Sequence, residues 1–127
     1  MTLAADTRPL LLLVDDEPTN LQVLRHILQE DYRLLFAKEG ARALEMAERE
    51  RPDLILLDVM MPGMDGPTTL KALRALPALA TVPVAFMTAK VQPAEVAQYK
   101  TLGALDVIPK PFDPMTLASQ VRAIWEA

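Results

Sequence analysis

Short and nearly uninterrupted apolar runs recur along this chain of 127 residues, and they constrain its fold more than any other feature. Residues 10–14 are entirely apolar, residues 53–57 and 82–87 are almost so, and residues 105–108 form a shorter run. Each run has the length of a strand and lacks the polar alternation of a strand that faces water on one side. Fully apolar strands are typical of a sheet that is covered on both faces.

Segments with helical spacing separate these runs. Their apolar residues recur every three or four positions, as on one face of a helix, at Leu21, Leu24 and Leu28; at Ala41, Leu44 and Ala47; at Leu70 and Leu73; and at Leu117, Val121 and Ile124. Residues 32–37 fit a further strand, and residues 93–102 fit a helix with proline in its first turn. The chain therefore alternates strand and helix over five units.

This alternation predicts an α/β fold, in which parallel strands are joined by right-handed crossovers. We expect a doubly wound, five-stranded parallel sheet with helices on both faces. The length fits one domain, so we predict a flexible tail at residues 1–9 and a single domain at residues 10–127. Ligands of such sheets bind just beyond the C-terminal ends of the strands.

Composition narrows the classes of function. The chain has no cysteine, which excludes disulfides and thiolate metal sites. No apolar run approaches the roughly 18 residues of a membrane span, and the first residues lack a signal-peptide pattern. Thirteen basic against 17 acidic residues give a net charge of −4, which argues against a nucleic-acid surface. We predict a soluble, cytoplasmic protein that binds neither nucleic acid nor membrane.

Reactive side chains follow the predicted strands where each one ends. Asp15 and Asp16 follow the first strand, Asp58 the third, Thr88 the fourth and Lys110 the fifth. The C-terminal ends of parallel strands meet at one edge of a sheet, so these groups should converge there. Three carboxylates at one place repel each other, and a divalent cation with hard oxygen ligands relieves that repulsion. The sequence therefore predicts a site for Mg²⁺, or for Mn²⁺.

The order of Asp15 and Asp16, Asp58, Thr88, and Lys110 followed by Pro111 resembles the receiver domain of bacterial response regulators, the CheY-like family. The resemblance covers nearly the whole chain. It implies a flavodoxin-like fold with strand order 2-1-3-4-5, an order that comes from the resemblance alone. It also implies a signalling switch of a two-component phosphorelay, and not a conventional enzyme.

The resemblance assigns a role to each acid. Asp58 would accept a phosphoryl group from the phosphohistidine of a sensor histidine kinase or phosphotransfer protein, or from a small acyl phosphate. Asp16 would bind Mg²⁺ directly and Asp15 partly through water. Asp58 itself and the backbone carbonyl of Met60 would complete the protein's share of the metal ligands.

It also assigns roles to the groups opposite the acids. Lys110 and the Thr88 hydroxyl would contact the phosphoryl oxygens, which is the charge neutralisation and positioning that phosphoryl transfer requires. The small Ala89 would leave the phosphoryl group room to enter. The bond from Lys110 to Pro111 would be cis.

Val107 departs from the family pattern. Many receivers carry Tyr or Phe three residues before the lysine, and that ring turns inward as the threonine moves. Because Val107 has no ring, we expect the loop after Thr88 and the helix beginning near Pro93 to carry the change to a downstream protein. A phosphorylation-dependent dimer is compatible with this scheme. No output segment follows Ala127, so the chain would signal by protein contact or belong to a longer protein.

Each assignment has a purely structural alternative. Asp15 and Asp16 could be acids at a helix N-terminus, and Asp58 could be a solvated loop acid. Thr88 could cap a helix, and Lys110 could be an ordinary surface lysine.

Three other features have structural interpretations. Asp65 and Gly66 indicate a turn and a helix cap. His26 falls on the polar side of the first predicted helix, so we expect it to be solvated and not to serve as a phosphorelay histidine. Trp125 lies one step off its apolar stripe, which predicts partial exposure at the edge of the last helix.

Three other classes of protein compete with a phosphorylation switch. A phosphatase-like hydrolase that forms an aspartyl phosphate would place its nucleophile on the first strand, with a second acid two residues later. A flavodoxin would need hydroxyls where Asp15, Asp16 and Glu17 stand. A degenerate receiver would be a fixed scaffold, although every chemical residue is present here.

Overall fold

A computed structural model, which describes residues 6–126, shows five parallel strands in one sheet. The strands are β1 (Leu10–Val14), β2 (Arg33–Ala37), β3 (Leu54–Asp58), β4 (Val84–Thr88) and β5 (Asp106–Pro109). The helices are α1 (Pro18–Leu28), α2 (Gly40–Glu50), α3 (Gly66–Ala75), the short 3₁₀ helix η1 (Pro77–Leu79), α4 (Pro93–Thr101) and α5 (Pro114–Glu126). The strand order β2-β1-β3-β4-β5 confirms the predicted fold.

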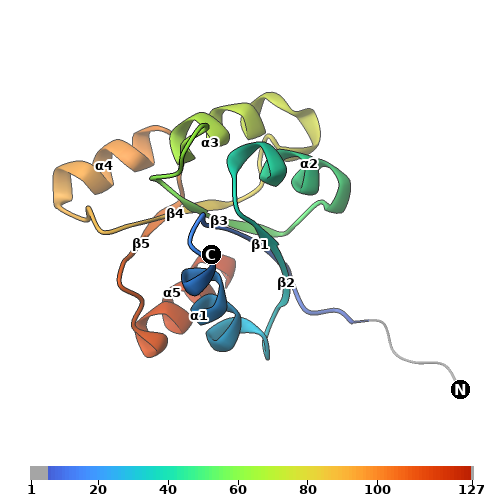
Figure 1. Ribbon diagram of the computed structural model, residues 1–127, viewed down its shortest axis with the longest axis vertical. Helices are drawn as coiled ribbons and strands as arrows, with labels where there is room; N and C mark the ends of the chain where they lie inside the picture. Colours follow the sequence, from blue (N-terminus) through green and yellow to red (C-terminus); the bar gives the residue numbers. More distant parts are fainter. Residues whose placement is uncertain (1–5, 127) are drawn as a thin grey trace, which may run out of the picture.

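The sheet forms the middle of three layers. Figure 1 shows α1 and α5 on one face and α2, α3 and α4 on the other. Neighbouring residues of one strand contribute to different layers: Leu11 and Leu13 of β1 pack on the α1 and α5 side, whereas Leu12 and Val14 pack on the other. Both faces are therefore dry, which is why the strands are almost wholly apolar.

Strand β1 has the predicted bounds, and the bounds of the other four strands differ from the predicted ones by one or two residues. Asp58 belongs to β3, because it pairs with Met87 of β4. Strand β4 begins after Pro83, whose carbonyl accepts a hydrogen bond from the Ile55 amide at 3.0 Å. Proline has no N–H to give to the sheet, so regular pairing of this strand starts one residue later.

The buried face of α2 corrects a prediction. Gly40, Ala43, Met46 and Ala47 are buried, whereas Ala41 is exposed and Leu44 only partly buried. Helix α2 packs on α3 at Gly40, where an added Cβ would collide with the Thr69 hydroxyl oxygen. Gly40 thus faces α3, and its neighbour Ala41 is exposed to solvent.

Helix α4 is the least buried helix among the described residues. None of its residues is fully buried. Its main aromatic contact is an edge-to-face packing of Tyr99 on Phe86 of β4, with ring centroids 5.4 Å apart. Few buried apolar contacts are the signature of an element that shifts at low cost.

The remaining structural expectations can be placed. Asp65 caps α3 by accepting a hydrogen bond from the Thr68 amide at 2.8 Å, as predicted. His26 is exposed, and Trp125 is 40% exposed.

Residues 1–5 of the predicted tail lie outside the described residues. Within the rest of the predicted tail, Arg8 donates hydrogen bonds to the carbonyls of Gln29 and Glu30, which follow α1. Between residues 6 and 126, no helix is long and apolar enough to cross a membrane.

Candidate acidic site at the sheet edge

The sheet brings the predicted reactive residues to one edge. Asp15 follows β1 directly, Asp58 ends β3, Thr88 ends β4 and Lys110 follows β5. Strands β1 and β3 are neighbours in the sheet although β2 lies between them in the chain. The site therefore lies where the strand order reverses, the usual ligand position of such sheets.

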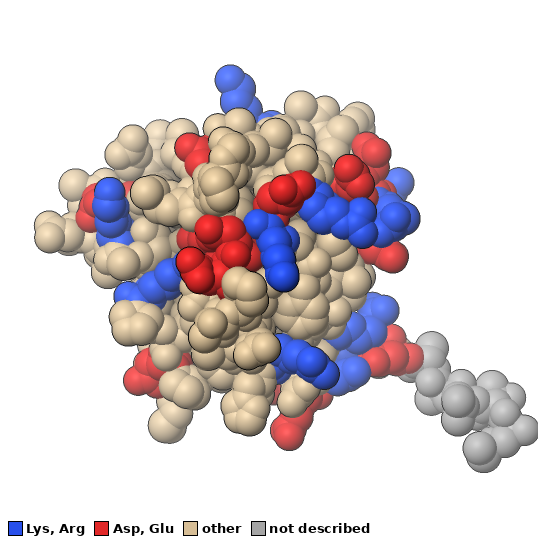
Figure 2. All heavy atoms as spheres, viewed as in Figure 1, with Lys and Arg blue, Asp and Glu red and all other residues tan. Residues whose placement is uncertain are grey.

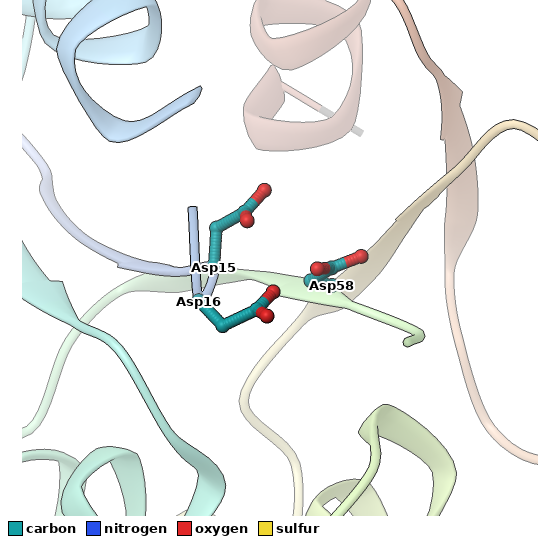
Figure 3. Close-up of side chains that lie close together, drawn as sticks. All are labelled: Asp15, Asp16 and Asp58. Carbon is teal, nitrogen blue, oxygen red and sulfur yellow. The ribbon is translucent and has the colours of Figure 1, made fainter. Parts of the chain in front are cut away.

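Three carboxylates meet at this edge. One oxygen from each of Asp15, Asp16 and Asp58 lies within 4.8 Å of the other two. Asp15 is fully buried and Asp58 is 3% exposed, while Asp16 is partly exposed at the rim. The Asp16 side chain extends toward Asp58, and that of Asp15 points to the α1 and α5 side (Figure 3). Acidic side chains gather near the middle of this face of the molecule, beside basic ones (Figure 2).

The buried Asp15 carboxylate is held by three donors. Its Oδ1 accepts from the Glu17 amide at 2.9 Å. Its Oδ2 accepts from the Asn20 side-chain amide at 3.1 Å and pairs with the Lys110 ammonium at 2.9 Å. A buried carboxylate requires such partners, because an unpaired one would be strongly destabilising. The first of these bonds comes from Glu17, the N-cap of α1, but Asp15 precedes the helix and no acidic residue stands in its first turn, so the structural alternative does not account for Asp15.

Lys110 joins two of the acids. Its Nζ lies 2.9 Å from Asp15 Oδ2 and 3.0 Å from Asp58 Oδ1, and its side chain is only 20% exposed. Burial lowers the pKa of the ammonium, but the hydrogen bonds to Asp15 and Asp58 outweigh burial and raise the pKa above its ordinary value. Lys110 therefore stays charged, and it is not an ordinary surface lysine.

Asp58 carries a disfavoured charge in the absence of metal. Burial raises the pKa of this carboxyl to about 6, and the neighbouring Asp15 charge adds to that effect. Hydrogen bonds from Lys110 and the Met60 amide lower the pKa but do not cancel the shift. Asp58 is thus a buried strand residue and not a solvated loop acid.

Thr88 ends β4, the strand beside β3, which ends in Asp58. Thr88 is 4% exposed, and its Oγ1 accepts from the Lys90 amide at 3.0 Å. The N-cap of α4 is Gln92, so Thr88 does not cap a helix. Ala89 follows at the exposed rim. The backbone amide of Lys110 donates to the Thr88 carbonyl at 2.9 Å, which links the ends of β5 and β4.

The remaining predicted site residues lie around this edge. Met60 follows Asp58 by two residues, and its side chain is 68% exposed. The peptide bond from Lys110 to Pro111 is cis. Val107 is 5% exposed within β5, and its carbonyl accepts from the Gln120 side chain of α5 at 2.7 Å.

Two residues of the site were missed in the sequence. Asn20 touches Asp15, and its place one turn into the first helix could have indicated this. Gly66 lies against the backbone at the end of β3: an added Cβ would collide with the Asp58 carbonyl oxygen and come within 2.8 Å of Val59 Cα. The sequence predicts only a turn and a helix cap at Gly66, because a sequence does not show which backbone a glycine approaches.

Residues 11–122 match the family model of the response regulator receiver domain. Response regulator PleD of Caulobacter vibrioides is 40% identical over 115 residues, which are 90% of this chain and 25% of PleD. DNA-binding response regulator MtrA of Mycolicibacterium smegmatis is 38% identical over 117 residues, 91% of this chain and 50% of MtrA. The chain thus spans a quarter to a half of the length of these relatives.

Solved structures with the same architecture include two receivers. The chemotaxis response regulator CheY4 of Vibrio cholerae has a TM-score of 0.88 at 33% identity, covering 93% of this chain and 99% of CheY4. The receiver domain of sensor histidine kinase PA1611 of Pseudomonas aeruginosa has a TM-score of 0.85 at 29% identity, covering 95% and 100%. That structure holds a magnesium ion coordinated in its active-site cleft.

Proposed function

Because the chain belongs to the response regulator receiver family of two-component signalling, we propose that Asp58 accepts a phosphoryl group and thereby switches the domain. One observation carries this proposal. The buried Asp58 carboxylate lies 3.0 Å from the Lys110 ammonium and within 4.8 Å of both other acids. Membership of the receiver family argues against the hydrolase and the flavodoxin, because the family model matches residues 11–122. Receivers are signalling switches and not conventional enzymes.

The positions of Asp58 and Lys110 support a transfer step in which Thr88 also takes part. A carboxylate oxygen of Asp58 attacks the phosphorus atom, and the phosphorus–nitrogen bond of a phosphohistidine breaks, with its electron pair returning to the imidazole. A small acyl phosphate would lose its carboxylate in the same way. Lys110 lies where its ammonium can neutralise phosphoryl oxygens. The Thr88 oxygen already accepts from Lys90, so its hydroxyl hydrogen is free to donate to another phosphoryl oxygen.

The acids fit a hard divalent cation. Mg²⁺ binds through one or two carboxylates, retains waters and pairs with phosphate oxygens. Asp16 and Asp58, with the Met60 carbonyl, would hold it directly. Asp15 would act through water, because its oxygens are already engaged by Glu17, Asn20 and Lys110. When bound, Mg²⁺ or Mn²⁺ supplies the positive charge that offsets the carboxylates and the phosphoryl group.

The change would spread through Thr88 and the loop to α4. The aliphatic Val107 provides no ring to swing inward, whereas α4 has no fully buried residue to hold it in place. We therefore assign the output to the β4–α4 region and a downstream protein, with a sensor histidine kinase or phosphotransfer protein as the phosphoryl source. Phosphorylation-dependent pairing of two copies is a further output of the same region.

Nucleic acid is not among the proposed partners. The chain carries a net charge of −4, which opposes phosphate backbones. MtrA is named a DNA-binding response regulator, but the match covers only 50% of MtrA, so its DNA binding is not carried over to this chain.

The test is the chemistry of the phosphorylated product. The purified chain is incubated with magnesium and acetyl phosphate, and the product is treated with hydroxylamine, which cleaves acyl phosphates. We expect uptake of one phosphoryl group that hydroxylamine removes and that requires magnesium. A hydroxylamine-resistant product would place the phosphate on a hydroxyl group and contradict the proposal, and no uptake would indicate a fixed scaffold.

A further inference from the structure

The side-chain amide of Asn20 on α1 donates to Asp15 Oδ2 at 3.1 Å, a bond that the transfer step itself does not use. We propose that Asn20 is a positioning residue, which holds the Asp15 carboxylate in place when the Lys110 ammonium leaves it for the phosphoryl group. This inference rests on the proposed phosphorylation of Asp58. It concerns how the charges of the site are balanced before and after phosphorylation of Asp58.

The argument begins with the burial of Asp15. Its side chain is fully buried, so both carboxylate oxygens depend on donors from the protein. Oδ1 has the Glu17 amide, which is part of the backbone and stays with the start of α1. Oδ2 has two donors, Asn20 and Lys110. Losing every donor of a buried charged oxygen costs far more than losing one of two.

Lys110 is the donor that must move. Its ammonium is shared between Asp15, at 2.9 Å, and Asp58, at 3.0 Å. Phosphorylation turns the Asp58 carboxylate into a mixed anhydride and places the negative charge on the phosphoryl oxygens. The ammonium follows that charge, and its bond to Asp15 weakens. With Asn20 present, Asp15 Oδ2 keeps a donor throughout the change.

Asn20 is suited to this task by its chemistry and its place. Its amide is neutral, so it adds no charge to a site that already holds three acids and one ammonium. Its backbone is fixed in the first turn of α1, where its N–H donates to the Glu17 carbonyl at 3.0 Å. Without its side chain, Asp15 Oδ2 would depend on Lys110 alone, and the ammonium would be held back from the phosphoryl group.

The test compares Asn20→Ala and Asn20→Leu with the wild type. The leucine keeps the approximate shape of the side chain and adds no charge, but it removes the donor. The matched control is Gln22→Ala, an exposed residue two positions along the same helix. The rate of phosphate uptake is measured by intact mass over a range of magnesium concentrations at saturating acetyl phosphate. NMR follows the ammonium signal of Lys110 in the unphosphorylated protein, and urea unfolding confirms that each variant is folded.

We expect both Asn20 variants to lower the maximal rate by about tenfold, the loss expected for one hydrogen bond to a charged group. In Asn20→Ala the magnesium concentration for half-maximal rate stays within about twofold, and the Lys110 ammonium protons exchange more slowly because the ammonium is held on Asp15. Gln22→Ala matches the wild type.

Two results would overturn the inference while leaving the proposed function intact. One is a maximal rate within twofold of the wild type in both Asn20 variants. The other is an unchanged Lys110 signal combined with equal losses in rate and magnesium affinity, which would indicate a merely structural role. Absence of uptake by the wild type would refute the proposed function, and this inference with it.

Discussion

The Lys110 ammonium nitrogen lies 3.0 Å from Asp58 Oδ1, yet the pKa of Asp58 remains raised, to about 6. Burial of the Asp58 carboxyl is the main cause of the raised pKa, and the neighbouring Asp15 charge adds to it. The same ammonium also pairs with the fully buried Asp15. One positive charge thus serves two carboxylates, with Asp16 beside them. The metal-free site carries excess negative charge, which a cation or a neutralising substitution would relieve.

Replacing Asp58 by Asn should stabilise the metal-free protein at neutral pH. Because the pKa of the folded state exceeds the ordinary 3.8, the ionised carboxylate destabilises the fold, and this effect develops as pH rises from about 4 through about 6. The difference between a pKa of about 6 and the ordinary 3.8 corresponds to ~3 kcal/mol of unfolding free energy at pH 7. Urea unfolding with a chelator at several pH values measures the difference between wild type and variant.

The difference in unfolding free energy between the wild type and Asp58→Asn should vanish below about pH 4, where the wild-type carboxyl is protonated. Glu48→Gln, which neutralises an exposed acid of α2, serves as the control and should change little. A wild type that is at least as stable as Asp58→Asn at pH 7 would contradict this account of the site's charge.

Magnesium should stabilise the wild type against unfolding. A ligand at a hundred times its dissociation constant adds about 2.7 kcal/mol when it binds only the folded state. Asp16→Asn should lose most of this stabilisation, because Asp16 is the partly exposed acid beside Asp58. Thermal unfolding with magnesium, or with potassium chloride at equal ionic strength, gives the comparison. Equal magnesium stabilisation of both proteins would place the metal elsewhere.

Gly66→Ala should slow phosphorylation without changing any charged group. Its new Cβ would collide with the Asp58 carbonyl oxygen and the Val59 backbone, and the Gly66 N–H that binds the Val59 carbonyl at 2.9 Å would have to move. Overpacking of this kind costs about 1–3 kcal/mol of stability. We expect at least a tenfold slower uptake of phosphate, followed by intact mass.

Gly63→Ala is the matched control for this experiment. Gly63 has a φ of 76°, so alanine there is strained, but its Cβ meets nothing within 4 Å. Both variants should therefore lose stability, and only Gly66→Ala should lose rate. Equal slowing in the two would show that the loop responds to strain in general and not to contact with Asp58.

Thr88→Val should uncouple uptake of phosphate from its relay. Valine keeps the shape but removes the hydroxyl, so the phosphoryl group should still be accepted while α4 responds less. Amide NMR shifts across residues 88–103, with and without phosphorylation, measure the relay, and Thr116→Val, on the exposed side of α5, is the control. Identical shifts in phosphorylated and free wild type would exclude this region as the output.

The architecture was predictable from the sequence because both faces of the sheet are buried. Runs such as residues 10–14 are apolar throughout, and a parallel sheet with helices on both faces buries them on both sides. Exact strand ends were less predictable. Asp58 is polar but belongs to β3, since backbone pairing with Met87 decides the matter and the side chain does not.

The chemical residues were predictable by position, because they follow apolar strands whose ends must meet. The order of the strands and the roles of the residues came only through resemblance to a family. Asn20 and Gly66 were missed because their contributions depend on which atoms they approach in the folded chain. For the same reason the buried face of α2 was misplaced, since the sequence does not show that Gly40 lies against Thr69 of α3.

The central claim is tested most directly by intact-mass measurement after incubation with magnesium and acetyl phosphate, comparing wild type with Asp58→Asn. The account predicts one phosphoryl group on the wild type, none on Asp58→Asn, and none on the wild type when the metal is chelated. Equal uptake by Asp58→Asn would show that another residue accepts the phosphoryl group and would contradict the account.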